Sequence, residues 1–289
     1  MMKKYVFSAL MILFFVAPLC AQDTVLANVY YEFKYVRDLA KMDDPYVAKM
    51  VLSLGKTTSR YCTESLFNLN DKKAIAAQKK EQERLSNAAS STLIVVTGKP
   101  LLRVNKYGAI IEEEITKNFA TKKMNIDAVM ASNQYTVNSG IPDIAWKIET
   151  EKKIINTYNC QKAVGTFSGR IYTVWFTIQL PYSNGPWKLG GLPGLILEAT
   201  DLKNEVSFLF KEITKGTSEV ENTNSFINNQ YSSVTSLKDY LKAKTAFEKD
   251  PEAIMSALSP NAKLGIKNID NPADKKVAKM GKYNAIELK

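Results

Sequence analysis

The chain has 289 residues, of which 45% are hydrophobic, and a formal net charge of +10. This length and apolar content favour a folded protein of one large or two modest domains over a disordered chain. The sequence contains no histidine, which excludes Ser-His-Asp and Cys-His catalysis and zinc sites built on imidazole. The positive charge would attract anionic lipid headgroups, or it contributes only to solubility. Because no run interleaves arginine with stacking aromatic residues, we predict no nucleic-acid partner.

The first 21 residues have the organisation of a secretory signal peptide. Lys3 and Lys4 precede an apolar run from Tyr5 to Val16, and Ala21 offers a small residue for cleavage. An apolar run of about 12 residues is shorter than the roughly 20 that span a bilayer, and no later stretch is long enough. We therefore predict an exported protein, in the periplasm or associated with the outer membrane, with no transmembrane segment after cleavage.

Residues 22–218 are expected to form a β-rich domain. In its first strand, from Leu26 to Val36, the aromatic residues Tyr31, Phe33 and Tyr35 alternate with Glu32 and Lys34, which is typical of a strand buried on one face. Similar patterns and intervening turn residues predict further strands at 47–54, 57–63, 92–97, 101–104, 108–115, 146–149, 153–166, 169–178, 195–200 and 206–213.

Two segments favour helix. Residues 64–90 are rich in Ala, Lys, Gln and Glu and lack Gly and Pro, which predicts one long inserted helix. Residues 219–289 form a polar extension, with a helix expected at 236–257 that Asp250 and Pro251 interrupt. The fold class is therefore α+β and β-rich, with a curved antiparallel sheet, one long helix and a helical C-terminal tail. This layout resembles the half-barrel of periplasmic lipoprotein carriers.

The segment from Pro181 to Gly194 is expected to be a shaped loop, because half of its fourteen positions are Pro or Gly. Pro193 and Gly194 suit the two central positions of a type II turn. The loop also carries Trp187, Leu189 and Leu192, which a surface connection does not need. These side chains either cap the protein's own core or line a groove for an apolar ligand or a partner's edge. A strand rather than a helix follows the glycines, so we predict no nucleotide site and no cofactor.

Three motifs together resemble the GLPGLI family of exported bacterial proteins. They are NGPWKLGGLPGLILEATD at Asn184–Asp201, the pair Tyr-x-Cys-x-Lys-Ala and Gly-Arg at 158–163 and 169–170, and Asn284–Glu287, where Ala285 replaces the usual proline of Asn-Pro-Ile-Glu. The resemblance extends along the whole chain. It implies no established biochemical activity and suggests an outer-membrane transport receptor as a partner.

The candidate binding residues are Trp187, Leu189, Leu192, Pro193, Gly194 and Arg170. Arg170 could bind a carboxylate or phosphate of a ligand, or pair with an internal acid such as Glu198 or Glu149. No catalytic residue and no metal ligand is assigned. The run Glu112 to Glu114 is interpreted as a solvated hairpin end, with a metal site as the alternative.

Cys62 and Cys160 are either a disulfide, which export permits, or two buried free thiols. The leading hypothesis is a non-enzymatic binding or accessory protein for an apolar ligand, a peptide or an envelope partner. One alternative is a histidine-free hydrolase that uses carboxylates, although Glu198 and Asp201, three apart on a strand, should face opposite sides. The other alternative is a structural subunit of an envelope assembly.

Overall fold

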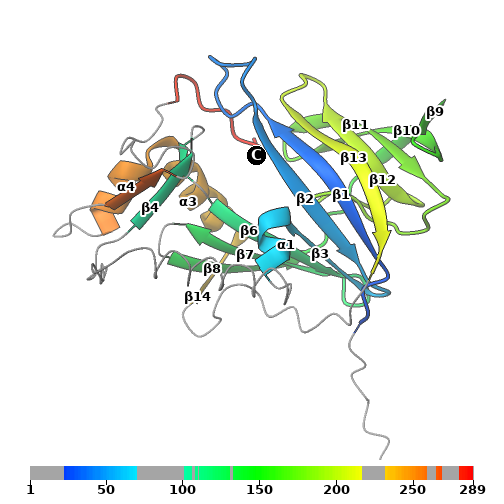
Figure 1. Ribbon diagram of the computed structural model, residues 1–289, viewed down its shortest axis with the longest axis horizontal. Helices are drawn as coiled ribbons and strands as arrows, with labels where there is room; N and C mark the ends of the chain where they lie inside the picture. Colours follow the sequence, from blue (N-terminus) through cyan, green and yellow to red (C-terminus); the bar gives the residue numbers. More distant parts are fainter. Residues whose placement is uncertain are drawn as a thin grey trace, which may run out of the picture.

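The computed structural model describes residues 23–69, 101–105, 108–109, 111–130, 133–216, 232–258, 265–268 and 280–288. One open, curved sheet dominates this part of the chain (Figure 1). Its strands lie in the order β14-β8-β7-β6-β3-β2-β1-β13-β12-β11-β10-β9, and all described pairs are antiparallel except β14 with β8. The predicted β-rich class with a curved, mostly antiparallel sheet is therefore confirmed.

The strands of this sheet are β1 Ala27–Tyr35, β2 Tyr46–Leu54, β3 Thr58–Thr63, β6 Ile111–Asn118, β7 Lys123–Met130, β8 Asn133–Gly140, β9 Trp146–Ile155, β10 Tyr158–Phe167, β11 Arg170–Thr177, β12 Leu195–Asp201, β13 Val206–Lys215 and β14 Ser232–Thr235. A second sheet joins β15 Gly265–Asn268, β4 Leu101–Asn105 and β5 Gly108–Ala109. The helices are α1 Glu64–Leu69, α3 Leu237–Lys249 and α4 Pro251–Leu258.

The first described strand, β1, lies in the middle of the large sheet. The order of the strands runs outward from β1 through β2, β3, β6 and β7 to β8. The chain then crosses to the far edge at β9 and returns strand by strand until β13 pairs with β1. β1 therefore joins the two halves, and its alternation places Val29, Tyr31 and Tyr35 in the core, at 0 to 4% exposure. The aromatic alternation predicted for this strand thus marks the centre of the sheet.

Two tight turns separate β9, β10 and β11. At Ser168 and Gly169, φ values of 48° and 76° give a left-handed two-residue turn between β10 and β11. A second turn lies at Asn156 and Thr157, where Asn156 has φ of 51°. The prediction of one strand over 153–166 was wrong, because asparagine tolerates the left-handed conformation and reverses the chain there.

The helical tail follows its prediction closely. The Ser236 side chain accepts a hydrogen bond from the Asp239 amide at 3.1 Å and caps α3, and Asp250 and Pro251 separate α3 from α4. Of the long helix predicted at 64–90, α1 covers Glu64–Leu69, and the remainder lies outside the described residues, as does the predicted strand at 92–97. The strands β7 and β8 were not predicted. None of the helices in the described ranges has the length and apolar character needed to cross a bilayer.

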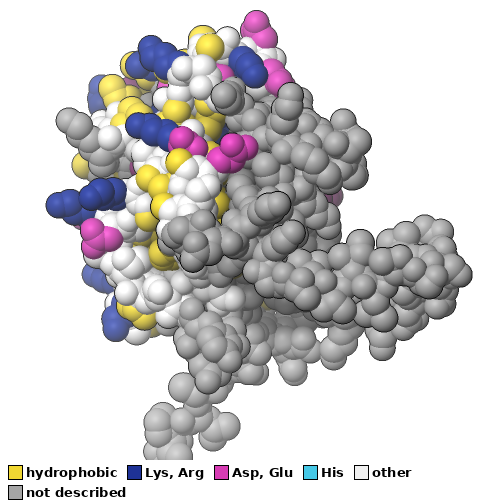
Figure 2. All heavy atoms as spheres, turned by 90° about the vertical axis from the view of Figure 1, so that its left-hand side faces the viewer, with side chains coloured by type: hydrophobic (Ala, Val, Ile, Leu, Met, Phe, Trp, Pro, Cys, Tyr) yellow, Lys and Arg dark blue, Asp and Glu magenta, His cyan; other side chains and the backbone are white. Residues whose placement is uncertain are grey.

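Figure 2 views the molecule from the side on which α3 and α4 lie in Figure 1. On the described part of this face, Lys and Arg side chains stand apart from one another among acidic and apolar ones. The net positive charge is thus dispersed there rather than gathered in one basic patch, which agrees with a contribution to solubility.

Candidate functional site

The loop of residues 181–194, called here the signature loop, connects β11 to β12 and folds onto the core. Leu189 and Leu192 are 0% and 2% exposed, and Trp187 is 5% exposed. The Trp187 ring stacks on Phe208 of β13, with centroids 6.1 Å apart, and meets Phe167 edge-on at 5.4 Å. The apolar side chains of the loop are therefore sheltered by the protein itself.

The turn at the end of this loop differs from the predicted type II turn. The Leu192 carbonyl accepts a hydrogen bond from the Gly194 amide at 2.8 Å, which closes a three-residue turn centred on Pro193. A Cβ atom on Gly194 would lie 2.1 Å from the Thr177 carbonyl oxygen, and its φ is 156°. Glycine is required here because the loop backbone presses directly against the end of β11.

Side chains from distant strands hold the buried carbonyls of the loop. Lys117 of β6 donates to the Leu189 carbonyl at 2.7 Å and to Asn184 Oδ1 at 3.0 Å. Trp146 of β9 donates from its indole nitrogen to the Gly190 carbonyl at 2.8 Å. Burial lowers the pKa of Lys117 to about 7. The loop is therefore fixed to both halves of the sheet.

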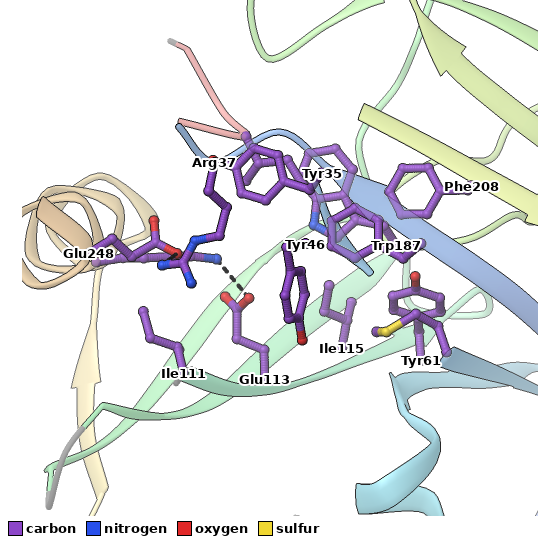
Figure 3. A pocket seen from close by; sticks show the side chains of 14 residues that line it. Tyr35, Arg37, Tyr46, Tyr61, Ile111, Glu113, Ile115, Trp187, Phe208 and Glu248 are labelled. Atoms are coloured by element: carbon purple, nitrogen blue, oxygen red, sulfur yellow. Dashed lines mark hydrogen bonds and ion pairs between the residues drawn. The ribbon is translucent and has the colours of Figure 1, made fainter. Parts of the chain in front are cut away.

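A cavity of about 120 Å³ lies beneath Trp187 (Figure 3). It is enclosed by the sheet, α3 and residues 280–288, called here the C-terminal segment. Most of its wall is apolar or aromatic and comes from β1, β2, β3, β6 and β13. The lining residues are Phe33, Tyr35, Arg37, Tyr46, Met50, Tyr61, Ile111, Glu113, Ile115, Trp187, Phe208, Lys244, Glu248 and Ile286. The side chains of β6 that reach the cavity, at 111, 113 and 115, share one face of that strand.

The end of the cavity nearest α3 is polar. Glu113 accepts hydrogen bonds from Lys244 at 2.7 Å and from the Tyr240 hydroxyl at 2.5 Å. Burial opposes ionisation of Glu113, but the positive charge of Lys244 and the hydrogen bonds from Lys244 and Tyr240 together outweigh burial and lower the pKa of this carboxyl. Arg37 Nη2 lies 3.6 Å from Glu248 Oε1.

Three polar atoms of the cavity wall have no hydrogen-bond partner among the residues that the structure describes. Arg37 is 8% exposed, and its Nε and Nη2 atoms have no hydrogen-bond partner among the described residues. The Tyr61 hydroxyl is also without one there. Buried donors in folded proteins nearly always find an acceptor, so these groups are the exceptions that point to a missing partner.

Arg170 lies in a separate buried cluster that joins β11 to the C-terminal segment. Its Nη1 atom is 2.7 Å from both Asp201 Oδ2 and Glu205 Oε2. Its Nη2 atom donates to Asn284 Oδ1 at 2.8 Å, and its Nε atom donates to the Ile286 carbonyl at 3.0 Å. The guanidinium is thus occupied by internal partners, although not by Glu198 or Glu149, the acids that the sequence suggested.

The C-terminal segment also contacts the signature loop. The Lys188 ammonium, 3% exposed at its side chain, lies 2.5 Å from Glu287 Oε1. Glu287 Oε2 in turn accepts from the Ser168 hydroxyl at 3.3 Å. Two motifs that stand about 100 residues apart in the sequence therefore form one buried assembly, with Ile286 reaching the cavity wall.

The six predicted binding residues occupy different places. Trp187 lines the cavity, Leu189 and Leu192 are core residues, Pro193 is exposed, and Gly194 is buried against β11. Arg170 does not line the cavity wall. Of the six, Trp187 alone contributes to the cavity in the part of the chain that the structure describes.

Cys62 and Cys160 are both free and buried. Cys62 lies on β3 and Cys160 on β10, and five strands separate them in the sheet. The disulfide alternative is therefore not realised, and both residues act as small apolar groups. Burial raises the pKa of Cys62 to about 12 and that of Cys160 to about 11, which disfavours the reactive thiolate.

The acidic candidates are engaged in separate ion pairs. Glu198 pairs with Lys153, whereas Asp201 pairs with Arg170 in the buried cluster, so the two carboxylates do not face each other. The interpretation of 112–114 as a solvated hairpin end was wrong. Glu114 is 1% exposed and pairs with Arg60 at 2.6 Å, and Glu113 binds α3. Among the described residues, no group of three or more acids and cysteines is placed to hold a metal ion.

Most residues of the cavity wall were not predicted from the sequence. The alternation of Phe33 and Tyr35 in the first strand was a usable signal for one wall. Arg37 and Glu248 carried none, because their proximity depends on how α3 docks against the end of β1, 211 residues earlier in the sequence. Cavities between elements that are distant in sequence require tertiary contacts that periodicity does not encode.

Comparison with known proteins gives little functional information. A family model described as "Protein of unknown function (Porph_ging)" matches residues 168–198, which include Arg170, β11 and the signature loop. No curated protein matches the sequence. Two solved structures of PNGF-II, in space groups P21 and C2, are similar to the chain, with TM-scores of 0.48 and 0.46 and 13% sequence identity. Each alignment covers 78% of this chain and about a third of PNGF-II, at 34% and 33%. A likeness at this level carries no argument about activity.

Proposed function

We propose that this chain is an exported binding protein of the GLPGLI type, which holds a small apolar ligand in the cavity beneath Trp187. The cavity carries the proposal, because it combines an aromatic wall with a few polar groups at one end. Small-molecule sites are typically concave, mostly apolar and supplied with a small number of placed polar groups.

The volume of the cavity bounds the ligand. An apolar cavity of about 150 Å³ accommodates benzene in another protein, so a cavity of 120 Å³ suits a compound of about one ring or a single apolar side chain. A lipid acyl chain would exceed this space. The resemblance to lipoprotein carriers therefore supports a β-sheet binding site in general terms, but not a lipid as its occupant.

The alternative of a carboxylate hydrolase has weaker support. Glu198 forms an ion pair with Lys153 and Asp201 forms one with Arg170. Neither carboxylate lines the cavity. A partner in the cell envelope, such as an outer-membrane transport receptor, remains part of the proposal only through the family resemblance.

Binding of toluene, measured by isothermal titration calorimetry, tests this function. The wild-type protein should bind one toluene per chain. Ile111→Trp, which adds a large ring at the cavity wall, should abolish binding by occupying the space. Ile148→Trp is the matched control, because Ile148 is 46% exposed on the edge strand β9.

Circular dichroism should show that both variants keep the β-rich fold, since overfilling a site costs about 1–3 kcal/mol of stability. Equal toluene binding by a folded Ile111→Trp variant would reject the cavity as the site. If the wild-type protein bound neither toluene nor phenol, its hydroxyl-bearing counterpart, the function itself would be rejected.

A further inference from the structure

The polar atoms without a described hydrogen-bond partner at the α3 end of the cavity determine which hydrogen-bonding group a ligand must have. At this end, Glu113 is bound by Lys244 and Tyr240, and Glu248 accepts from the Tyr283 hydroxyl. The atoms there without a hydrogen-bond partner in the described part of the chain, Arg37 Nε and Nη2, are hydrogen-bond donors only. A ligand that completes the site must therefore present an acceptor to Arg37.

The charge balance at the same end limits the kind of acceptor. Arg37 and Lys244 carry two formal positive charges, and Glu113 and Glu248 carry two negative charges within the same cluster. A ligand anion would add an uncompensated charge to a largely buried group of ions, which is strongly unfavourable. A neutral oxygen adds the hydrogen bond without that penalty.

The cavity wall beyond the polar end favours a ligand with an aromatic ring. The Phe33 and Phe208 rings stack with centroids 4.9 Å apart, and Trp187 stacks on Phe208 in turn. Figure 3 shows Tyr35, Tyr46 and Trp187 between the polar end and Tyr61. A flat ring fits such surroundings through offset or edge-to-face contacts.

We infer that the cavity binds a neutral aromatic compound of about benzene size, whose single oxygen accepts a hydrogen bond from Arg37. This inference rests on the proposed function and deepens it, since it specifies the ligand class and the residue that recognises it. Tyr61 lies away from α3 and is assigned no part in recognising the oxygen.

The test compares phenol with toluene, which has the same size and shape but no oxygen, by calorimetry at pH 7. Arg37→Met keeps an unbranched side chain as far as the position of Nε and removes the guanidinium donors. It should therefore weaken phenol binding about tenfold or more, the effect of losing a hydrogen bond to a charged group. Toluene affinity should not change. Tyr61→Phe, the control at the opposite end, should affect neither ligand.

A second variant guards against misfolding of Arg37→Met. Arg37→Lys retains the positive charge opposite Glu248 but replaces the planar guanidinium with a shorter side chain whose ammonium donors lie elsewhere. Phenol affinity should therefore still fall selectively, by less than in a variant without donors. Benzoate serves as the anionic probe and should bind the wild-type protein more weakly than phenol.

The outcomes separate the two proposals. If wild-type protein binds toluene but Arg37→Met and Arg37→Lys leave phenol affinity unchanged, the assignment of Arg37 is overturned while the binding function stands. If Tyr61→Phe lost phenol affinity while the Arg37 variants kept it, Tyr61 would be the residue that binds the oxygen. That result would overturn the assignment of Arg37 as well. Tighter binding of benzoate than of phenol would overturn the neutral ligand. If neither toluene nor phenol binds, the function itself fails.

Discussion

At the scale of single residues, Lys117 shows how a buried charge-bearing group can hold a loop. Its neutral amine has two N–H donors, and they match the two acceptors of the signature loop, Asn184 Oδ1 and the Leu189 carbonyl. Protonation would add a charge to a site that is 2% exposed. The depressed pKa of Lys117 follows directly from this burial.

This pKa predicts a pH-dependent stability. The folded-state pKa of Lys117 is about 7, whereas an unperturbed lysine has a pKa of about 10.4. Between these values the unfolded state binds more protons, so the contribution of Lys117 to the unfolding free energy rises with pH, by a total on the order of 4 kcal/mol. The unfolding free energy of wild type minus that of Lys117→Met should therefore increase from pH 7 to about pH 10 in urea titrations.

Lys123→Met provides the matched control, because Lys123 is an exposed residue of the neighbouring strand β7. Its difference from wild type should stay constant over the same pH range. A constant difference for Lys117→Met as well would show that this lysine is charged in the folded protein.

At the scale of elements, the C-terminal segment and the signature loop act as one unit. The Lys188–Glu287 pair joins them, with side chains only 3% and 8% exposed. Such a pair, unlike a surface ion pair, has little solvent screening and is sensitive to the loss of either partner.

A double-mutant cycle with Lys188→Met and Glu287→Gln should measure this coupling. Each single variant leaves a buried charge without its partner, so the double variant should be more stable than the sum of the two losses predicts, by about 1–3 kcal/mol. Chemical denaturation supplies the four unfolding free energies. The same cycle on Lys147 and Glu149, 3.9 Å apart with 82% and 25% exposure, should give a coupling near zero. Equal couplings in the two cycles would contradict a buried link between the loop and the C-terminal segment.

The strands and helices themselves were largely predictable from the sequence, but the tertiary contacts between them were not. Alternation and turn residues located β1, β2, β3, β12 and β13, and the interruption at Asp250 and Pro251 located the end of α3. β7 was missed because its run KMNIDAVM mixes buried and polar residues irregularly. The docking of Asn284 and Glu287 onto Arg170 and Lys188 was not predictable from spacing, because no local pattern records a contact across 99 or more residues.

At the scale of the whole molecule, the cavity exists because the two halves of one sheet curve around a common core. β1, β2, β3 and β6 supply one side, β13 and the signature loop supply another, and α3 with Ile286 closes the remaining end. Trp187 was identified from the sequence because a tryptophan on a proline- and glycine-rich loop needs shelter. The sequence left open whether that shelter was core or cavity, and Trp187 contacts both.

The most direct test of the binding site is a crystal structure of the protein soaked with bromobenzene, with the bromine located by its anomalous scattering. We predict one strong bromine peak inside the cavity, enclosed by Phe33, Tyr46 and Trp187, with the ring resting against these aromatic side chains. Peaks confined to the surface, or a cavity filled by its own side chains without ligand, would contradict the central claim that this space is a binding site.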